Sequence, residues 1–249
     1  MTIPKIAEPS VKSLYIQMNF NDQELAQGTA FTINTKRGPT LITNRHNVTG
    51  RHQHTGNPLH STGGLPNQIT IWHNSKQYLG RWVAKTEPLY EEESPRWREH
   101  PLLRDKADFV ALPLTQLKDV QIFPYDPSNP GTDILVGMAD ILSVVGFPFG
   151  IRAGGSLAVW ATGFMASEPD INYDELPVFL IDCRSRTGQS GSPVIAYRSG
   201  GWVATSTGGG VFKDGVYKFL GIYSGRINKE SDLGMVWKTS AVKELADSL

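Results

Sequence analysis

The chain has 249 residues, of which 39% are hydrophobic and 19% are charged, and it contains 25 glycines and 16 prolines. This composition is typical of a globular, turn-rich protein and excludes a disordered chain. The formal net charge is zero, which argues against a surface for binding nucleic acid or an acidic membrane.

Short strand-like runs separated by turn residues predict an all-β chain. In the first half these runs alternate apolar and polar residues or favour β-branched ones. They cover residues 13–18, 28–34, 39–43, 69–73, 78–85 and 109–114. The segment 51–67 is polar and rich in glycine and proline, which predicts an exposed loop. The charged segment 87–103 contains three prolines and is predicted to be a long surface insertion.

The segment 121–132 holds three prolines and is the best candidate for a connection between two halves. The strand pattern then resumes at residues 141–146, 158–164, 178–182, 192–197, 202–206, 219–224 and 234–238. The tail, residues 240–249, predicts a helix with Ser240 as its N-cap. About a dozen short strands and one terminal helix suggest two packed barrels. We expect one domain over residues 1–249, with barrels at about 1–120 and 133–238.

The cysteine content and the N-terminus bear on the compartment. Cys183 is the only cysteine, so an intramolecular disulfide and a multi-cysteine metal site are both impossible. A secreted protein of this size often carries disulfides, so their absence favours a reducing compartment. The first 20 residues contain no long uncharged apolar stretch and predict neither a signal peptide nor a membrane helix. We therefore expect a cytoplasmic protein without a cofactor or a bound metal.

The most informative stretch is residues 187–193, Thr-Gly-Gln-Ser-Gly-Ser-Pro, followed by a strand. Gly188 and Gly191 permit a tight turn that exposes the hydroxyl of Ser190 as a nucleophile. The backbone N–H groups of Gly188 and Ser190 can then form an oxyanion hole, worth about 3–4 kcal/mol per donor. The alternative is an ordinary Gly-Ser turn between two strands.

A histidine and an aspartate supply the remaining groups for acyl transfer. His46 follows an apolar run, unlike the other five histidines, although a structural histidine is the alternative interpretation. Asp108 directly precedes a buried strand, where a carboxylate is expensive to desolvate without a partner. The imidazole of His46 is a suitable partner, whereas the rival Asp105 lies among charged neighbours and looks solvated. The order His, Asp, Ser is that of chymotrypsin-type barrels.

Several segments together resemble the trypsin-like peptidase family, and its intracellular bacterial branch in particular. Residues 43–46 resemble the catalytic-histidine segment, residues 108–112 the aspartate strand and residues 188–193 the serine segment. Residues 145–150 are similar to the Gly-x-Pro-Phe-Gly turn of HtrA-type proteases, and residues 221–225 to the strand beside the substrate cleft. The resemblance implies two six-stranded antiparallel chymotrypsin-like barrels, a catalytic triad and a polypeptide substrate.

The resemblance also implies where substrate binds. Tyr223, Ser224 and Gly225 would pair with extended substrate backbone by adding a strand to an exposed edge. Arg184 and Arg226 match positions near the selectivity pocket, and two arginines would favour an acidic side chain. The alternative is that both arginines point to solvent.

Two departures from the family pattern are informative. Members that are activated by N-terminal cleavage carry an aspartate before the serine, whereas this chain has Gln189. We therefore predict that activation does not use a freed N-terminus. The peptide-binding domain that follows the protease in HtrA-type enzymes has no counterpart among the 249 residues.

The sequence favours a serine endopeptidase that works through an acyl-enzyme, regulated by a protein partner or by a narrow substrate range. A second hypothesis is a binding module that keeps the cleft but has lost turnover. An esterase of the α/β-hydrolase type is a weaker alternative, because its alternating helices are missing from the predicted pattern. Residues His52, His54 and His60 share one loop, where a solvated loop is favoured over a metal site.

Overall fold

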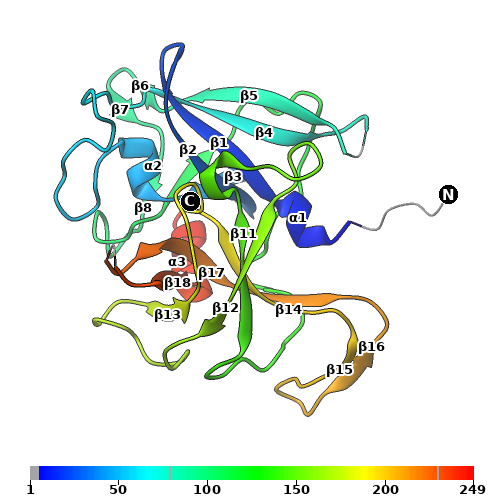
Figure 1. The fold of residues 1–249 in the computed structure, drawn as a ribbon. Helices are drawn as coiled ribbons and strands as arrows, with labels where there is room; N and C mark the ends of the chain where they lie inside the picture. Colours follow the sequence, from blue (N-terminus) through cyan, green and yellow to red (C-terminus); the bar gives the residue numbers. More distant parts are fainter. Residues whose placement is uncertain (1–5, 79, 229) are drawn as a thin grey trace.

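The computed structural model describes residues 6–78, 80–228 and 230–249. Strands of the first half form one eight-stranded antiparallel sheet, drawn in the upper part of Figure 1. The pairing runs β10-β4-β1-β2-β3-β9-β8, and β5 pairs with the other edge of β4. The strands are β1 (Ser13–Phe20), β2 (Gln23–Thr35), β3 (Gly38–Thr43), β4 (Gln68–Ser75), β5 (Trp82–Pro88), β8 (Arg98–Glu99), β9 (Val110–Pro113) and β10 (Val120–Gln121).

The second half forms a closed six-stranded barrel, below the first sheet in Figure 1. The order is β11-β12-β13-β18-β17-β14, and neighbouring strands are antiparallel throughout the barrel. The barrel strands are β11 (Ile141–Gly146), β12 (Val159–Met165), β13 (Val178–Asp182), β14 (Pro193–Arg198), β17 (Val216–Arg226) and β18 (Leu233–Lys238). Two short hairpins complete the strands: β6 (Tyr90–Glu91) with β7 (Ser94–Pro95), and β15 (Gly201–Val203) with β16 (Gly210–Phe212).

The all-β class is confirmed, and the halves differ in how they close. The second half has the six strands expected for a barrel. In the first half β4 pairs with β1 near Ile71 and with β10 near Ser75, while β5 covers its other edge. Three partners along one strand make an eight-stranded sheet in place of the expected six strands.

The helices are short. The terminal helix α3 (Thr239–Asp247) confirms the predicted one, but Lys238 occupies the N-cap position assigned to Ser240, and no side chain caps it. Two five-residue helices were not predicted, since neither is long enough to show a helical repeat: α1 (Glu8–Lys12) and α2 (Arg45–Thr49). A 3-10 turn, η1, spans Pro148–Gly150. Within the described ranges, no helix is long and apolar enough to cross a membrane.

One hydrophobic cluster joins the two halves and fixes where they meet. It contains Phe31 and Phe109 from the first sheet and Phe219 and Trp237 from the barrel. The rings of Phe31 and Phe219 lie 5.3 Å apart, and those of Phe109 and Trp237 lie 5.5 Å apart. Each such buried aromatic side chain contributes about 1.5–3 kcal/mol by leaving water. The ends of β3, β9, β14 and β17 are thereby held beside one another.

The segment 87–103 is exposed over most of its length, as its charges and prolines predict, but it is anchored in the core. Leu89 is fully buried and Trp97 is 6% exposed, and both belong to the core of the first sheet. The buried Glu87 carboxylate accepts hydrogen bonds from the backbone N–H groups of Thr115 (2.6 Å) and Gln116 (2.7 Å). These bonds compensate the burial of the charge.

Candidate active site

His46 is presented by the tight turn that ends β3. The chain leaves β3, passes the fully buried Asn44 and enters α2, where His46 is the second residue. The side-chain amide of Asn44 donates a hydrogen bond of 2.5 Å to the backbone carbonyl of Asp108. Gly50 ends the helix in the left-handed conformation, with φ of 64°. The hydrogen bond of Asn44 thus connects the segment that carries His46 to the residue Asp108, just before β9.

Asp108 holds His46 at two points. One carboxylate oxygen accepts the backbone N–H of His46 at 3.1 Å, and the other lies 2.7 Å from the ring Nδ1. The second oxygen also accepts the hydroxyl of Ser224 at 2.6 Å. An ionised carboxylate only accepts hydrogen bonds, so Nδ1 of His46 must carry the proton. The other ring nitrogen, Nε2, is then unprotonated and has a free lone pair. Asp108 therefore fixes the tautomer that a general base requires.

The same pair shifts the pKa of His46. Burial disfavours the imidazolium and is the largest single influence, but the charge of Asp108 and its hydrogen bond outweigh burial. The net result is a pKa of His46 raised above its ordinary 6.5. The protein thus stabilises the cation that forms when the ring takes up a proton.

Ser190 sits at the centre of a turn that only glycines allow. Gly188 and Gly191 have φ of 94° and 88°. A Cβ on Gly191 would lie 2.0 Å from the carbonyl oxygen of Thr29, and one on Gly188 would lie 2.4 Å from that of Phe147. The turn is therefore pressed against both halves of the fold.

The hydroxyl of Ser190 donates to the carbonyl oxygen of Ser224 at 3.3 Å. Among the described residues, no hydrogen bond joins Ser190 to the His46 ring. Ser224 connects them instead, because its hydroxyl binds the same Asp108 oxygen as the ring. The backbone carbonyl of Ser190 also accepts the Asn47 side chain at 3.4 Å, one residue beyond His46. The three predicted residues therefore belong to one connected site.

Two backbone N–H groups near Ser190 are left available. The carbonyl of Thr187 accepts the N–H of Phe149 at 2.6 Å, and the carbonyl of Gln189 accepts the N–H of Ser192 at 3.0 Å. In a trans peptide the C=O and N–H point in opposite directions, so the N–H groups of Gly188 and Ser190 face away from these partners. Neither N–H donates to another described residue.

Two contributors were missed by sequence reasoning. Thr29 is fully buried; its hydroxyl donates to the carbonyl of Gly188 at 2.8 Å and accepts the N–H of Phe147 at 3.1 Å. Ser224 was predicted to pair with substrate backbone, but the bond from its hydroxyl to Asp108 was not predicted. A threonine in a strand that also holds Thr32 and Thr35 gives no signal of this kind, and the contact of Ser224 joins residues 116 positions apart.

The fold places some of the residues predicted to bind substrate beside His46 and others away from it. Gly225 and Arg226 line a cavity beside His46, whereas the Tyr223 ring is 2% exposed and its hydroxyl binds that of Ser185. Arg184 does not line this cavity; its side chain is 80% exposed and lies 4.0 Å from Asp232.

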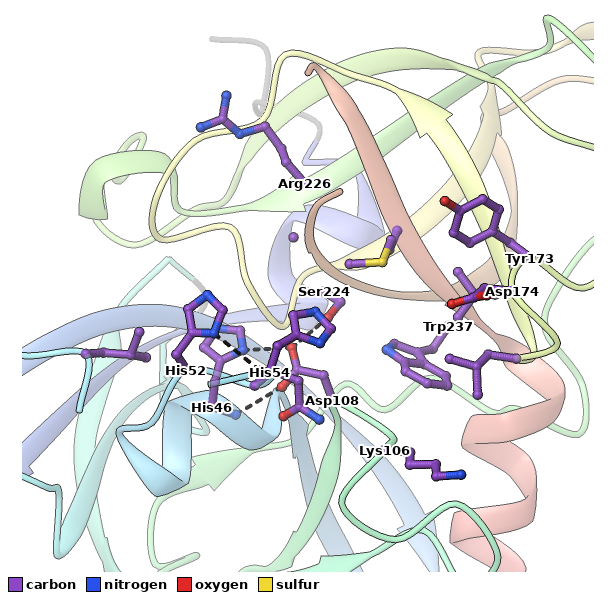
Figure 2. Close-up of a pocket in the computed structure, with 16 residues that line it drawn as sticks. His46, His52, His54, Lys106, Asp108, Tyr173, Asp174, Ser224, Arg226 and Trp237 are labelled. Atoms are coloured by element: carbon purple, nitrogen blue, oxygen red, sulfur yellow. Dashed lines mark hydrogen bonds and ion pairs between the residues drawn. The ribbon is translucent and has the colours of Figure 1, made fainter. Parts of the chain in front are cut away.

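The cavity beside His46 has a volume of about 250 Å³, and we call it the His46 cavity. It is lined by loop 52–59 of the first half, by residues 173–178 and by the ends of β17 and β18. In Figure 2 His52 and His54 lie on one side of the cavity and Tyr173 and Trp237 on the other, and the Arg226 side chain extends away from them. The lining residues are His46, His52, Gln53, His54, Leu59, Lys106, Asp108, Tyr173, Asp174, Leu176, Val178, Ser224, Gly225, Arg226, Met235 and Trp237.

The loop histidines have structural partners. The Nδ1 atom of His52 accepts the N–H groups of His54 and Thr55, each at 3.3 Å, and His60 Nδ1 lies 2.8 Å from the Thr62 hydroxyl. Within the described part of the chain, no group of three or more His, Cys, Asp or Glu residues is arranged to hold a metal ion.

The fold and this arrangement define a class of protein. A family model described as "Trypsin-like peptidase domain" matches residues 28–204, which contain His46, Asp108 and Ser190. The chain therefore belongs to the trypsin-like peptidase family. No curated protein sequence matches it.

Solved structures give the same fold. The chain is similar to the serine endoprotease from Yersinia pestis, with a TM-score of 0.55 at 12% identity, over 99% of this chain and 69% of that one. It is also similar to the Rv3671c protease of M. tuberculosis in an inactive form, with a TM-score of 0.44 at 17% identity, over 94% and 87% of the two chains. The first similarity shows a trypsin-like serine protease fold.

Proposed function

We propose that this chain is a serine endopeptidase in which Ser190 is the nucleophile, His46 the general base and Asp108 the residue that orients the base. The observation that carries the proposal is the Asp108 carboxylate, which binds both the backbone and the ring of His46 and connects through Ser224 to Ser190. A carboxylate placed in this way leaves Nε2 of His46 as the acceptor for the serine proton.

The reaction proceeds through an acyl-enzyme. His46 Nε2 takes the proton of Ser190 as its oxygen attacks the substrate carbonyl, and the N–H groups of Gly188 and Ser190 bind the resulting oxyanion. The imidazolium then gives its proton to the leaving amine, which breaks the C–N bond and leaves an ester on Ser190. Water, deprotonated by His46, hydrolyses this ester and restores the serine.

Catalysis requires one local movement. The Ser190 hydroxyl must leave the Ser224 carbonyl and turn toward Nε2 of His46. The bond that it leaves is 3.3 Å long, which is beyond the usual range for hydroxyl donors. Rotation about a single side-chain bond is inexpensive, and catalytic hydrogen bonds often tighten only when substrate is bound.

Substrate backbone has an edge to bind. Strand β17 pairs with β14 as far as Ile222, opposite Pro193, and the backbone of Tyr223 still bonds to residues 191 and 192, so it is not available to substrate. The residues beyond Tyr223 remain paired with β18. The β14 side of Gly225 and Arg226 is therefore open. We propose that the acyl part of an extended peptide adds there as a strand.

A catalytically silent peptide-binding module is the second candidate. The bond between Ser190 and Ser224, in place of one to His46, is the observation that favours it. The two candidates share the same cleft and differ only in whether Ser190 is activated.

A fluorophosphonate probe separates the two candidates. The enzyme predicts covalent labelling of the wild type and none of Ser190→Ala. The matched control is Ser192→Ala, which makes the same change two residues away at a buried hydroxyl without a partner; it should label like the wild type. A wild-type chain that stays unlabelled while binding peptides would establish the silent module.

We further propose that the enzyme is cytoplasmic and restricted, either by a partner protein or by a narrow substrate range. The loop 52–59 and the segment 173–178 stand on either side of the cavity next to His46, which supports restricted access. Purified protein should then leave casein intact while it reacts with the fluorophosphonate. Free degradation of casein would refute the restriction without affecting the proposed chemistry.

A further inference from the structure

A small antiparallel sheet, which we call the hairpin sheet, packs against the barrel. Strands β15 and β16 form a hairpin, and a third segment pairs with the chain just beyond β15. In this segment Ile134 bridges to Thr205, and the N–H of Leu135 donates to the carbonyl of Ala204 at 3.0 Å. In Figure 1 the hairpin lies at the lower right, far from α2, the helix that carries His46. The hairpin sheet is therefore remote from the candidate active site.

Alternation along the strands divides the side chains of the hairpin sheet between two faces. The inner face carries Ile134 and Val203, which are 1% and 3% exposed and belong to the core of the barrel. Trp202 and Val211 are direct register partners and share the outer face. Leu135 joins them there, because it lies opposite the residue two positions beyond Trp202.

The outer face of the hairpin sheet is apolar. Leu135, Trp202 and Val211 are 54%, 68% and 78% exposed. An antiparallel sheet that has one face in water normally carries polar side chains on that face. Contiguous apolar side chains at the surface of a protein mark a place where another surface binds. The outer face is therefore a docking surface, and its charge and area identify the partner.

The Trp202 ring is held in place on the outer face. A Cβ on Gly209 would lie 2.7 Å from this ring, so the ring lies directly against the Gly209 backbone. Gly209 has a φ of 137°, a conformation that side chains rarely adopt. An aromatic side chain that is already ordered loses little entropy on binding, and tryptophan is enriched among the residues that dominate protein interfaces.

The charges around the outer face balance. Lys218 pairs with Asp133 at 2.7 Å, and Arg198 pairs with Asp140 at 3.1 Å. Strand β16 is followed by one lysine and one aspartate, and the formal net charge of the whole chain is zero. Such a rim attracts neither an acidic lipid surface nor a strongly charged protein, and it does not repel an identical rim.

The exposed area suits a weak dimer. A large apolar side chain that is half exposed or more offers roughly 100 Å², so the three outer side chains together offer about 300 Å². A standard interface takes about 800 Å² from each partner, and somewhat more than half of that area is apolar. The outer face thus supplies about two-thirds of the apolar area of a standard interface, and the balanced rim supplies polar area around it.

We propose that the outer face of the hairpin sheet binds the same face of a second copy of this chain. The contact is isologous, so Leu135, Trp202 and Val211 of one copy pack against the same residues of the other. Two sheets that stack face to face lie about 10 Å apart, and an identical sheet supplies the flat apolar surface that such stacking requires. Because the hairpin lies far from α2, the contact leaves the His46 cavity of each copy uncovered.

Sedimentation velocity over a range of micromolar concentrations tests the dimer. We expect a dissociation constant of about 1–100 μM, since small interfaces are weak. Trp202→Ser should raise this constant by about tenfold or more. The matched control is Leu102→Ser, which changes an apolar side chain that is 80% exposed in a turn of the first half, and it should leave the constant unchanged. A wild-type chain that stays monomeric, or a dimer that Trp202→Ser leaves intact, would overturn the inference.

A second variant guards against loss of the fold. Val211→Lys changes a side chain that is 78% exposed, and urea unfolding should give a free energy of unfolding close to that of the wild type. In an isologous contact the two new lysines face each other, so the dimer should weaken at low salt and partly recover at high salt. A dimer of Val211→Lys that is as strong as that of the wild type at low salt would contradict the contact.

Cross-linking tests whether the two faces are equivalent. The native Cys183 is buried, so the thiol introduced by Val211→Cys is the accessible one. A short bis-maleimide should link two copies of Val211→Cys and should not link Leu102→Cys. If Val211→Cys gave no link although Trp202→Ser dissociates the dimer, the face would bind a different surface and the isologous contact would be wrong. Phosphatidylcholine vesicles should leave the wild type in the supernatant; binding of a monomer to them would assign the face to lipid instead.

Discussion

The hydroxyl of Thr29 donates a hydrogen bond of 2.8 Å to the carbonyl oxygen of Gly188, across the boundary between the two halves of the fold. The backbone N–H of the same threonine donates to the carbonyl of Ser190 at 3.0 Å, and its carbonyl accepts the hydroxyl of Thr43 at 2.8 Å. Thr43 lies three residues before His46. The side chain and backbone of one buried residue thus connect the loop proposed to bind the oxyanion with the strand that leads to His46, the proposed general base.

Thr29→Val should reduce kcat by about 10- to 100-fold, because the Gly188 carbonyl loses its donor and the loop that carries the N–H groups of Gly188 and Ser190 is held less firmly; loss of a whole oxyanion donor costs about 10²–10³. The buried N–H of Phe147 also loses its acceptor, which costs about 1–3 kcal/mol of unfolding free energy. Thr29→Ser keeps the hydroxyl and should retain most of kcat. Steady-state kinetics and urea unfolding measure both effects. If Thr29→Val lowered only the free energy of unfolding and left kcat of the folded protein unchanged, Thr29 would have no role in the candidate site.

Asp108→Asn should lower kcat by about 10⁴-fold, because an amide at this position no longer selects the tautomer with a free Nε2. The neighbouring Asp105→Asn makes the same change at an exposed carboxylate and should leave kcat near the wild-type value. Rates of hydrolysis of a fluorogenic peptide give the comparison. Equal loss in both variants, or none in Asp108→Asn, would contradict the role of Asp108.

The pH profile should follow the raised pKa of His46. The base must be neutral to accept the proton of Ser190, so kcat/KM rises with pH as the imidazolium loses its proton. Because Asp108 holds the pKa above 6.5, the acidic limb has its midpoint above that value. In Asp108→Asn the residual activity should have its midpoint at lower pH, since the carboxylate charge is gone. A midpoint well below 6.5 in the wild type would show that another group limits the rate.

The sequence predicts the positions of the strands far better than the long-range contacts that support the candidate site. The runs 141–146 and 178–182 coincide with β11 and β13, because buried β-branched residues bounded by turns have few alternatives. The buried anchors of the segment 87–103 were not predicted, because proline and charge are local signals, while the burial of Leu89 and Trp97 depends on distant strands. Likewise His46, Asp108 and Ser190 stand out by their local motifs. Thr29 becomes visible only when residues 159 positions apart meet.

Acid should destabilise the protein through His73, a histidine outside the proposed site. Its side chain in β4 is 1% exposed, and burial lowers its pKa to about 4, despite the opposing charge of Glu87. Above pH 6.5 neither the folded nor the unfolded chain holds the proton. Between 6.5 and about 4 only the unfolded chain binds it, so stability falls by about 1.4 kcal/mol per pH unit as the pH drops.

The variant His73→Gln keeps a neutral polar side chain that does not titrate. Its unfolding free energy should therefore fall less between pH 7 and pH 5 than that of the wild type, by about 2 kcal/mol. Some acid sensitivity should remain, because burial also lowers the pKa of His100, against the pull of Glu244. Urea unfolding at the two pH values provides the measurement. Parallel losses in variant and wild type would mean that His73 already takes up its proton in the folded state, and that the strand opens to let water reach it.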